Sequence, residues 1–244
     1  MIRVENLTKL FSETNGARDI SFELVPGDIV GMVGDNGAGK STIIKTFFNE
    51  YRRNDGKVYY NNEVINKRKY KDFAFFPDQS IYPRNISIER FCIYSGCLSN
   101  MSKKESKSTT LKLLRHLELF EHRTKTFKEL SAGMQKKALL AITMVSDPEV
   151  IILDEPTSNL DVKSRIEFLD ILKRLSEKNK IIVITSHIIN ELQGLVNRVL
   201  IIKDSRLVLD KYLENNEKII DLYQQSASKH FQLDKQGSFE DIFS

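Results

Sequence analysis

The stretch DIVGMVGDNGAGKST, residues 28–42, decides the fold of this 244-residue chain. Its first six residues are mostly aliphatic, and such a short unbroken run is typical of a strand buried on both faces of a parallel sheet. The residues that follow match the pattern G-x-x-x-x-G-K-[ST], with Gly34, Gly39, Lys40 and Ser41 at the specified positions. A strand that runs directly into this loop and then into a helix predicts a phosphate-binding site.

The residue types in this loop suit the binding of phosphate oxygens. Glycines let backbone N–H groups close around an anion, and the N-terminus of the following helix adds a partial positive charge. Lys40 is expected to reach the β and γ phosphates of ATP, and the Ser41 hydroxyl to help hold Mg²⁺. The candidate nucleotide-binding residues are the whole loop: Gly34, Asp35, Asn36, Gly37, Ala38, Gly39, Lys40, Ser41 and Thr42.

A second acidic segment, VIILDEPTSNLD at residues 150–161, completes the pattern of a nucleotide hydrolase. Successive side chains of a strand point to opposite faces, so one carboxylate is expected to face the metal and the other the γ-phosphate. Asp154 suits the Mg²⁺ shell, and Glu155 suits the general base that orients the attacking water. Paired acids at a strand end can also be merely solvated, but the phosphate loop favours the catalytic interpretation.

The rest of the chain predicts an α/β fold, a P-loop NTPase core with a central, mostly parallel sheet. Three more aliphatic runs read as buried strands: residues 150–153, 181–184 and 199–202. Helical patterns lie between these runs. Strands that alternate with amphipathic helices are typical of an α/β fold with a mostly parallel sheet. One predicted helix, residues 164–179, carries apolar residues at helical spacing: Ile166, Leu169, Leu172 and Leu175.

Two regions break this alternation. Three segments near the start alternate apolar and polar residues and predict a small antiparallel β subdomain: residues 3–11, 20–28 and 56–65. Residues from about 80 to 148 are mostly helical in pattern and predict an inserted α-helical subdomain. The ATP-binding domain is expected to span residues 2–226, and the polar residues 227–244 to form a loosely held C-terminal tail.

Composition excludes several functional classes. The formal net charge of +4 is small for 244 residues, so no nucleic-acid partner is expected. Cys92 and Cys97 lack the C-x-x-C spacing of zinc and redox sites and read as free thiols in a reducing compartment. No apolar run approaches the roughly 18–20 residues of a membrane helix, and the start lacks the apolar core of a signal peptide. We therefore expect a cytoplasmic location.

Further motifs follow in a characteristic order, with LSAGMQKK at residues 130–137 and VITSH at residues 183–187. Together with the two segments above, they resemble the ATP-binding subunits of ABC transporters over nearly the whole chain. DEPTSNLD resembles the family's acidic strand and its D-loop, Ser158 to Asp161, and LSAGMQKK resembles the signature usually written LSGGQ. The resemblance implies an ABC-type ATPase fold and ATP hydrolysis.

The resemblance also implies roles for particular residues. His187 stands where the family has a switch histidine that contacts the γ-phosphate, and Phe11 where it has an aromatic that stacks on adenine. In the family, two ATP-binding domains sandwich ATP head to tail, so Ser131, the N–H groups around Gly133, and Asp161 would meet the partner's nucleotide. Plain structural roles remain alternatives: Ser131 as a helix cap, His187 as a structural side chain and Phe11 as a core residue.

This sequence departs from the family pattern at two motifs. The signature has Ala132 for glycine and Met134 for glutamine, and a methyl group at position 132 is tolerable only if the backbone there avoids positive φ. Loss of the amide at Met134 predicts weaker closure on ATP, unless a partner supplies the better site. In FFPDQ, Asp78 takes the place of the usual glutamine or glutamate near Mg²⁺, and Gln79 remains the alternative.

The expected function is that of an ATP-driven translocase subunit, held at the inner face of the membrane by a separate integral membrane permease. Residues 78–87 would receive that permease. The single domain and short tail favour export, for example of peptides or antibiotics. A soluble ABC-type ATPase of a non-transport assembly, such as an iron–sulfur scaffold, is the competing interpretation, and a nucleotide-dependent binding module with little turnover is a third. The pair of domains would be two copies or two different subunits.

Overall fold

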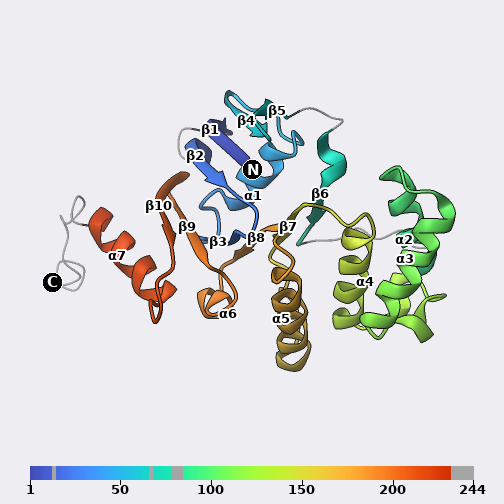
Figure 1. Cartoon of the computed structure of the whole chain (residues 1–244). Helices are drawn as coiled ribbons and strands as arrows, with labels where there is room; N and C mark the ends of the chain where they lie inside the picture. The colour runs from blue at the N-terminus through green and yellow to red at the C-terminus, as the bar shows by residue number, and fades with distance from the viewer. Residues whose placement is uncertain (13–14, 66–68, 79–84, 232–244) are drawn as a thin grey trace.

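The computed structural model of the chain describes residues 1–12, 15–65, 69–78 and 85–231. Figure 1 shows the elements in layers: an antiparallel sheet lies uppermost, helix α1 (Lys40–Phe47) lies beneath it, and a second sheet follows. Helices α5 (Val162–Ser176) and α6 (Ile189–Leu192) cover the lower face of that second sheet. The phosphate loop therefore lies between the two sheets, at the start of α1.

The second sheet has six strands in the order β10-β9-β3-β8-β7-β6 among the described residues. Every neighbouring pair from β9 to β6 is parallel, and only β10 is antiparallel to its neighbour. The α/β fold with a mostly parallel central sheet is thus confirmed, and the four aliphatic runs are strands in it. The strands are β3 (Ile29–Val33), β6 (Phe73–Phe76), β7 (Val150–Asp154), β8 (Ile181–Ser186), β9 (Arg198–Lys203) and β10 (Arg206–Tyr212).

Strand β6 has no counterpart among the strands predicted from sequence. It pairs in parallel with β7, and Phe73 lies opposite Val150. Its four residues are three phenylalanines and an alanine, too few to show a period. Two residues of β6 are held by contacts from distant segments, since Phe73 packs on Phe47 and Phe76 on Phe168. Tertiary packing, not local pattern, makes this segment a strand.

The antiparallel sheet has the order β2-β1-β4-β5. All its neighbouring pairs are antiparallel, as the alternating pattern near the start of the chain predicts. Its strands are β1 (Ile2–Leu10), β2 (Gly16–Leu24), β4 (Asp55–Tyr60) and β5 (Glu63–Val64).

Two hydrophobic cores lie on the two faces of the six-stranded sheet, and strand β7 shows how they divide. Val150 and Ile152 pack in the core shared with the antiparallel sheet and α1. Ile151 and Leu153 pack in the other core, with residues of α4, α5 and α6. Because alternate side chains point to opposite faces, a continuous aliphatic run fills both cores.

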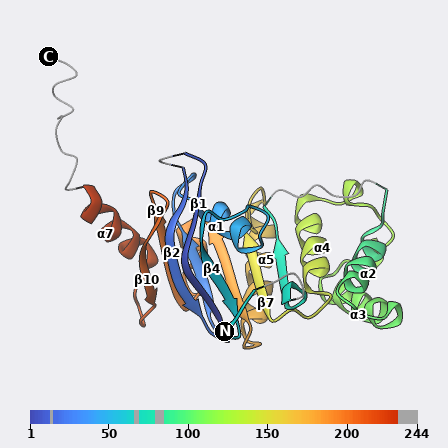
Figure 2. The ribbon, with the colours of Figure 1, turned by 90° about the horizontal axis from the view of Figure 1, so that it is seen from above.

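Helices α2 (Ile88–Leu98), α3 (Lys103–His116) and α4 (Ala132–Met144) form a group at one side of the sheet in both views (Figures 1 and 2). Two short 3₁₀ turns, Phe120–His122 and Phe127–Glu129, connect α3 to α4, and a third, Lys69–Asp72, directly precedes β6. Helix α7 (Ile219–Phe231) lies at the opposite side. Within the described ranges, no helix combines the length and the apolar character needed to cross a bilayer.

The apolar face of α5 differs from the prediction at one residue. Phe168 and Leu172 are buried against the sheet, but Ile166 is 57% exposed. Each residue advances a helix by about 100°, so Ile166 lies roughly 200° around the axis from Phe168. Ile166 thus shares the helical spacing of Leu172 but does not lie on the buried face, because the inward face is set by Phe168.

Candidate functional site

The phosphate loop joins β3 to α1 in a conformation that requires glycine. Gly37 and Gly39 have φ of 84° and 108°, a region that other residues rarely adopt. A Cβ at Gly39 would also lie 2.3 Å from the carbonyl oxygen of Gly16. Gly39 is the N-cap of α1 and no side chain caps that helix, which leaves N–H groups of its first turn available to an anion.

Lys40 is buried at the start of α1, and its ammonium lies inside the loop. Nζ donates to the carbonyl oxygens of Gly34, at 2.6 Å, and Asp35, at 3.2 Å. Burial lowers the pKa of Lys40, and the nearby carboxylates of Glu155, Asp154 and Asp35 oppose that shift. The loop thus holds a desolvated cation where phosphate oxygens would enter.

Ser41, Asp154 and Thr185 form a chain of oxygen atoms beside this cation. The Ser41 hydroxyl lies 3.4 Å from Oδ1 of Asp154, and the buried Thr185 hydroxyl donates to the same oxygen at 2.7 Å. Carboxylate and hydroxyl oxygens are ligands that Mg²⁺ accepts, and it usually shares them with phosphates and water. The described residues hold no cluster of three or more His, Cys, Asp or Glu suited to a metal. These donors fit a magnesium ion held jointly with a nucleotide.

Glu155 and His187 meet where β7 and β8 end. The His187 Nδ1 atom lies 2.8 Å from Oε2 of Glu155. Strand β7 ends at Asp154, and Glu155 has a left-handed φ of 45°. Its N–H donates to the Thr185 hydroxyl at 2.9 Å. Strand alternation was therefore the wrong reason for the separate directions of the two carboxylates, because Glu155 lies in the turn beyond the strand.

Asp78 follows β6 and contacts the D-loop. The Ser158 hydroxyl donates to Oδ1 of Asp78 in a short hydrogen bond. Lys136 of α4 donates to Ser158 and to the Asp78 carbonyl oxygen. Gln79, the alternative residue for this position, lies outside the described residues, as does much of the segment predicted to receive a permease.

The signature turn begins helix α4. Ser131 is its N-cap and accepts from the Met134 N–H at 3.4 Å, so the helix-capping interpretation is confirmed. Ala132 is the first helical residue and does not have positive φ, which explains how its methyl group is tolerated. A Cβ at Gly133 would lie 2.8 Å from the Ser164 hydroxyl oxygen, so glycine permits close packing against α5.

Asp161 caps the neighbouring helix, α5. Its carboxylate accepts from the Ser164 N–H at 2.9 Å and from the Ser164 hydroxyl at 2.8 Å, and these bonds lower the pKa of Asp161. Since Ser164 also packs on Gly133, the signature turn and the D-loop lie side by side.

The candidate residues fall into two sets on different elements. One set surrounds the start of α1 and the ends of β7 and β8: Lys40, Ser41, Asp154, Glu155 and His187. The other lies at the N-termini of α4 and α5: Ser131, Gly133 and Asp161. Helix α4 packs on α2, α3, α5 and β6, whereas α1 packs on β1 and β2.

Comparison with known proteins identifies the family. A family model described as ABC transporter matches residues 17–158. The chain belongs to the ABC transporter family. It is an ATP-hydrolysing cassette of that family, as its phosphate loop and acidic strand predicted.

Three similar proteins illustrate the relationship. An uncharacterised ABC transporter ATP-binding protein, MJ1023 of Methanocaldococcus jannaschii, is 31% identical over 85% of this chain and 76% of its own length. The lantibiotic transport ATP-binding protein SrtF of Streptococcus pyogenes is 25% identical over 91% of this chain and 96% of its own. A dimeric post-hydrolysis structure of the cassette MJ0796, bound to ADP and Pi, has a TM-score of 0.77 at 22% identity and covers 88% of this chain and 100% of its own.

Phe11 is not a core residue of the cassette. The residue is 53% exposed, and its ring packs edge-on against Tyr51, with centroids 5.2 Å apart. Lys9 Nζ lies 5.1 Å from the Phe11 ring. The adenine-stacking role stays a prediction, and the exposure of the ring is compatible with it. The remaining loop residues differ in exposure, since Asn36 is exposed, Thr42 is half-buried and Ala38 is buried.

Three residues that the sequence did not single out belong to the site of the cassette. Thr185 bonds both acidic residues of the β7 end, and Lys136 bonds the D-loop. The Tyr223 hydroxyl of α7 donates to Oδ1 of Asp35 in the phosphate loop at 2.7 Å. Burial and this bond raise the pKa of Tyr223 to about 12. Lys136 and Thr185 lie within quoted motifs, but no local pattern shows which groups these three residues bond, because their partners are remote in sequence.

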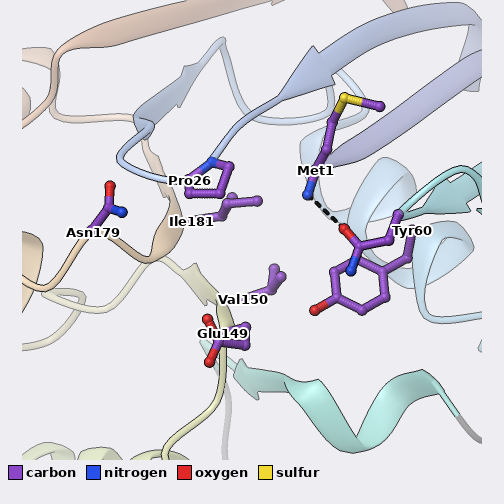
Figure 3. A pocket seen from close by; sticks show the side chains of 8 residues that line it. Met1, Pro26, Tyr60, Glu149, Val150, Asn179 and Ile181 are labelled. Atoms are coloured by element: carbon purple, nitrogen blue, oxygen red, sulfur yellow. Dashed lines mark hydrogen bonds between the residues drawn. The ribbon is translucent and has the colours of Figure 1, made fainter.

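A pocket of about 280 Å³ lies at the other end of the sheet (Figure 3). Val150 and Ile181, which line it, begin β7 and β8, whereas the acidic residues and His187 follow the carboxyl ends of those strands. The Met1 amino group donates to Asn61 Oδ1 there at 2.9 Å. This pocket is therefore separate from the phosphate loop.

Proposed function

We propose that this cassette powers an exporter by binding Mg-ATP between two ATP-binding domains and hydrolysing it. The observation that carries the proposal is the 2.8 Å contact between Glu155 and His187, next to the phosphate loop. A carboxylate oriented by a histidine beside a bound triphosphate is the arrangement needed to position a water molecule for attack.

Lys40 and the first turn of α1 would bind the phosphates. The Lys40 ammonium now donates to two loop carbonyl oxygens, so phosphate oxygens would replace neutral acceptors with charged ones. The uncapped N–H groups of α1 add donors that point along the helix axis. Charge-assisted hydrogen bonds are stronger than neutral ones, which favours binding of the triphosphate at this place.

Ser41 and Asp154 would hold Mg²⁺ against the phosphates, and the ion would neutralise negative charge that develops during phosphoryl transfer. Thr185 orients the Asp154 carboxylate by donating to it, and it anchors the Glu155 backbone by accepting from its N–H. Thr185 thus keeps the metal ligand and the base in fixed relation.

Glu155 would accept the proton of the attacking water. Its carboxylate has a histidine nitrogen on one oxygen, and the second oxygen is left to meet the water. His187 is exposed, which would allow it to reach the γ-phosphate as well as Glu155. The two residues would bring water and phosphorus into line without forming a covalent intermediate.

A second ATP-binding domain would complete the site. Ser131 and the start of α4 are exposed, and they lie beside Asp161 on elements other than those that carry Lys40. A head-to-tail pair would bring this surface of one domain to the nucleotide of the other. The dimeric structure of the MJ0796 cassette, which has a similar fold, supports such pairing.

ATP hydrolysis at the cytoplasmic face of the membrane would drive transport through a separate permease. The relative SrtF is named for lantibiotic transport, and this supports a peptide or antibiotic as the exported substrate. The domain is proposed to span residues 2–226, with a helical subdomain of about residues 80–148 and a tail of residues 227–244, and residues 78–87 are proposed to receive the permease.

The test is a purification of tagged Glu155→Gln protein from membranes in the presence of Mg-ATP. The substitution removes the base, so we expect ATP to bind while hydrolysis falls by orders of magnitude, about 10²-fold or more. The trapped complex is expected to retain a polytopic membrane protein. Recovery of soluble partners alone would contradict the transport role, and parent-like turnover would remove Glu155 as the base.

A further inference from the structure

Lys136 is a buried lysine in the second turn of α4, only 7% exposed. Lysine is seldom buried so completely, because a desolvated ammonium is costly unless hydrogen bonds replace its water. Burial lowers the pKa of Lys136, and the carboxylates of Asp78, Asp154 and Glu155 oppose the shift. The side chain is shielded from solvent and feels the charge of the acidic groups of the site.

The Lys136 ammonium has an acceptor for each of its three N–H bonds. Nζ lies 3.1 Å from the Ser158 hydroxyl oxygen, 3.3 Å from the Asp78 carbonyl oxygen and 3.5 Å from the Glu155 carbonyl oxygen. An ammonium carries three donors and no acceptor, so this set satisfies it fully. The Phe76 ring, 5.3 Å from Nζ, adds a cation–π contact.

The three acceptors belong to two segments of the site, because Glu155 and Ser158 lie in one turn, where the Ser158 N–H donates to the Glu155 carbonyl oxygen at 3.1 Å. Asp78 follows β6, Glu155 follows β7 in a left-handed conformation, and Ser158 belongs to the D-loop. Ser158 passes the hydrogen-bond chain on by donating to the Asp78 carboxylate. Lys136 itself lies on the helix that Ser131 caps. One side chain therefore ties the signature helix to the turn that carries Glu155.

We propose that Lys136 is a positioning residue for ATP hydrolysis, which holds the Glu155 turn and Ser158 in register with the signature helix. This proposal rests on the catalytic role proposed for Glu155. A non-Gly residue at positive φ persists only where its surroundings hold it, and the Lys136 ammonium is one of the groups that bond the Glu155 peptide. Movement of α4 would be transmitted through this contact to the base.

The neighbouring Lys137 offers a matched control. It lies on the same helix, but its Nζ bonds Glu167 of α5 at 2.9 Å, and that carboxylate is 43% exposed. Replacing either lysine by methionine removes one charge from α4 and keeps a chain of similar length. Only the change at Lys136 removes the donors to Asp78, Glu155 and Ser158.

The experiment compares Lys136→Met and Lys137→Met in steady-state ATP hydrolysis, with nucleotide affinity measured separately. We expect Lys136→Met to lower kcat by about 10- to 100-fold, the cost of a small misplacement of a catalytic group. KM and nucleotide affinity should stay within about threefold of the parent, because Lys40 and the phosphate loop are untouched. Lys137→Met should keep kcat within about twofold. A parent-like kcat for Lys136→Met, or an equal loss in both variants, overturns the proposal.

A double-mutant cycle with Ser158→Ala tests whether the lysine acts through this network. If the two side chains work as a unit, the double variant should lose little more kcat than Lys136→Met alone. If the kcat losses of the two single variants multiply in the double variant, the proposal is overturned. Thermal melting shows whether each variant folds, and Lys136→Leu, which also lacks a side-chain donor, replaces Lys136→Met under the same criteria if the methionine variant does not.

The proposed function is tested separately, by the ATP turnover of Glu155→Gln. Parent-like turnover of Glu155→Gln would remove the base, whatever Lys136→Met does. Loss of turnover in Glu155→Gln together with parent-like turnover in Lys136→Met would keep the base and overturn the positioning role.

Discussion

Thr185→Val is the substitution that tests the core of the site most directly. Thr185 is completely buried, with 0% exposure, and its hydroxyl both donates to Asp154 and accepts from the Glu155 N–H. Valine has nearly the same shape, so the change removes two hydrogen bonds without opening a large cavity. The loss of stability in Thr185→Val therefore measures the contribution of the hydroxyl group and not that of side-chain packing.

The expected loss of unfolding free energy follows from the two hydrogen bonds that Thr185→Val removes. A hydrogen bond to a charged group contributes about 1.5–3 kcal/mol, and a buried N–H left without a partner costs about 1–3 kcal/mol. We therefore expect a loss of roughly 2.5–6 kcal/mol of unfolding free energy in Thr185→Val. For a chain of this size, each kcal/mol lowers the melting temperature by about 2–4 °C. The expected fall is at least about 5 °C.

Thr185→Ser is the matched control, since it keeps the hydroxyl and removes one methyl group. That change costs about 1 kcal/mol, or about 2–4 °C. Calorimetric melting of the three proteins measures the difference, and ATP hydrolysis measures its consequence for Asp154 and Glu155. Turnover should fall in the valine variant and stay near the parent in the serine variant. Equal melting temperatures for parent and valine variant, or a serine variant as unstable as the valine one, would refute the reasoning.

Three other predictions concern the partner surface, the C-terminal helix and the thiols. Ser131→Arg should abolish turnover while each monomer still binds ATP, as measured by ATPase assay and nucleotide titration; unchanged turnover would mean that the signature does not meet a partner's nucleotide. Because the folded state raises the pKa of Tyr223 from 10.0 to about 12, its bond to Asp35 should stabilise the parent fully below pH 10.0 and progressively less up to about pH 12. Denaturation of the parent and Tyr223→Phe across that range should show their difference shrinking, and a constant difference would contradict this. Burial raises the pKa of Cys92 to about 12, so a thiol reagent should label Cys97 first in the native protein and both after unfolding; equal native rates would be contrary evidence.

Much of the fold could be predicted from local pattern. The aliphatic runs are strands because they must fill cores on both faces of a sheet, and that demand is visible residue by residue. The phosphate loop is equally local, since Gly39 must be glycine for a backbone reason. Strand β6 could not be found in this way, because its pairing with β7 and its aromatic contacts come from remote segments. The exposure of Ile166 escaped prediction because the orientation of α5 is decided by packing.

The candidate site was likewise predictable only where its residues belong to local patterns. Lys40, Asp154 and Glu155 were found because their chemistry lies within short motifs of fixed spacing. Thr185 and Lys136 lie within quoted motifs but were given no role, since a threonine in a strand and a lysine in a helix are ordinary residues until their partners are known. The direction of the Glu155 side chain was likewise set by its left-handed turn.

By itself, the sequence predicted most of the strands and helices and the candidate residues for ATP hydrolysis, because backbone preference and motif spacing act over a few residues. Only the tertiary structure decided that Lys136 is buried among three carbonyl and hydroxyl oxygens, and that Tyr223 reaches the phosphate loop from α7. The physical reason is that burial and hydrogen-bond partners depend on distance in space, and residues far apart in the chain come within that distance only when the sheet and its helices have packed.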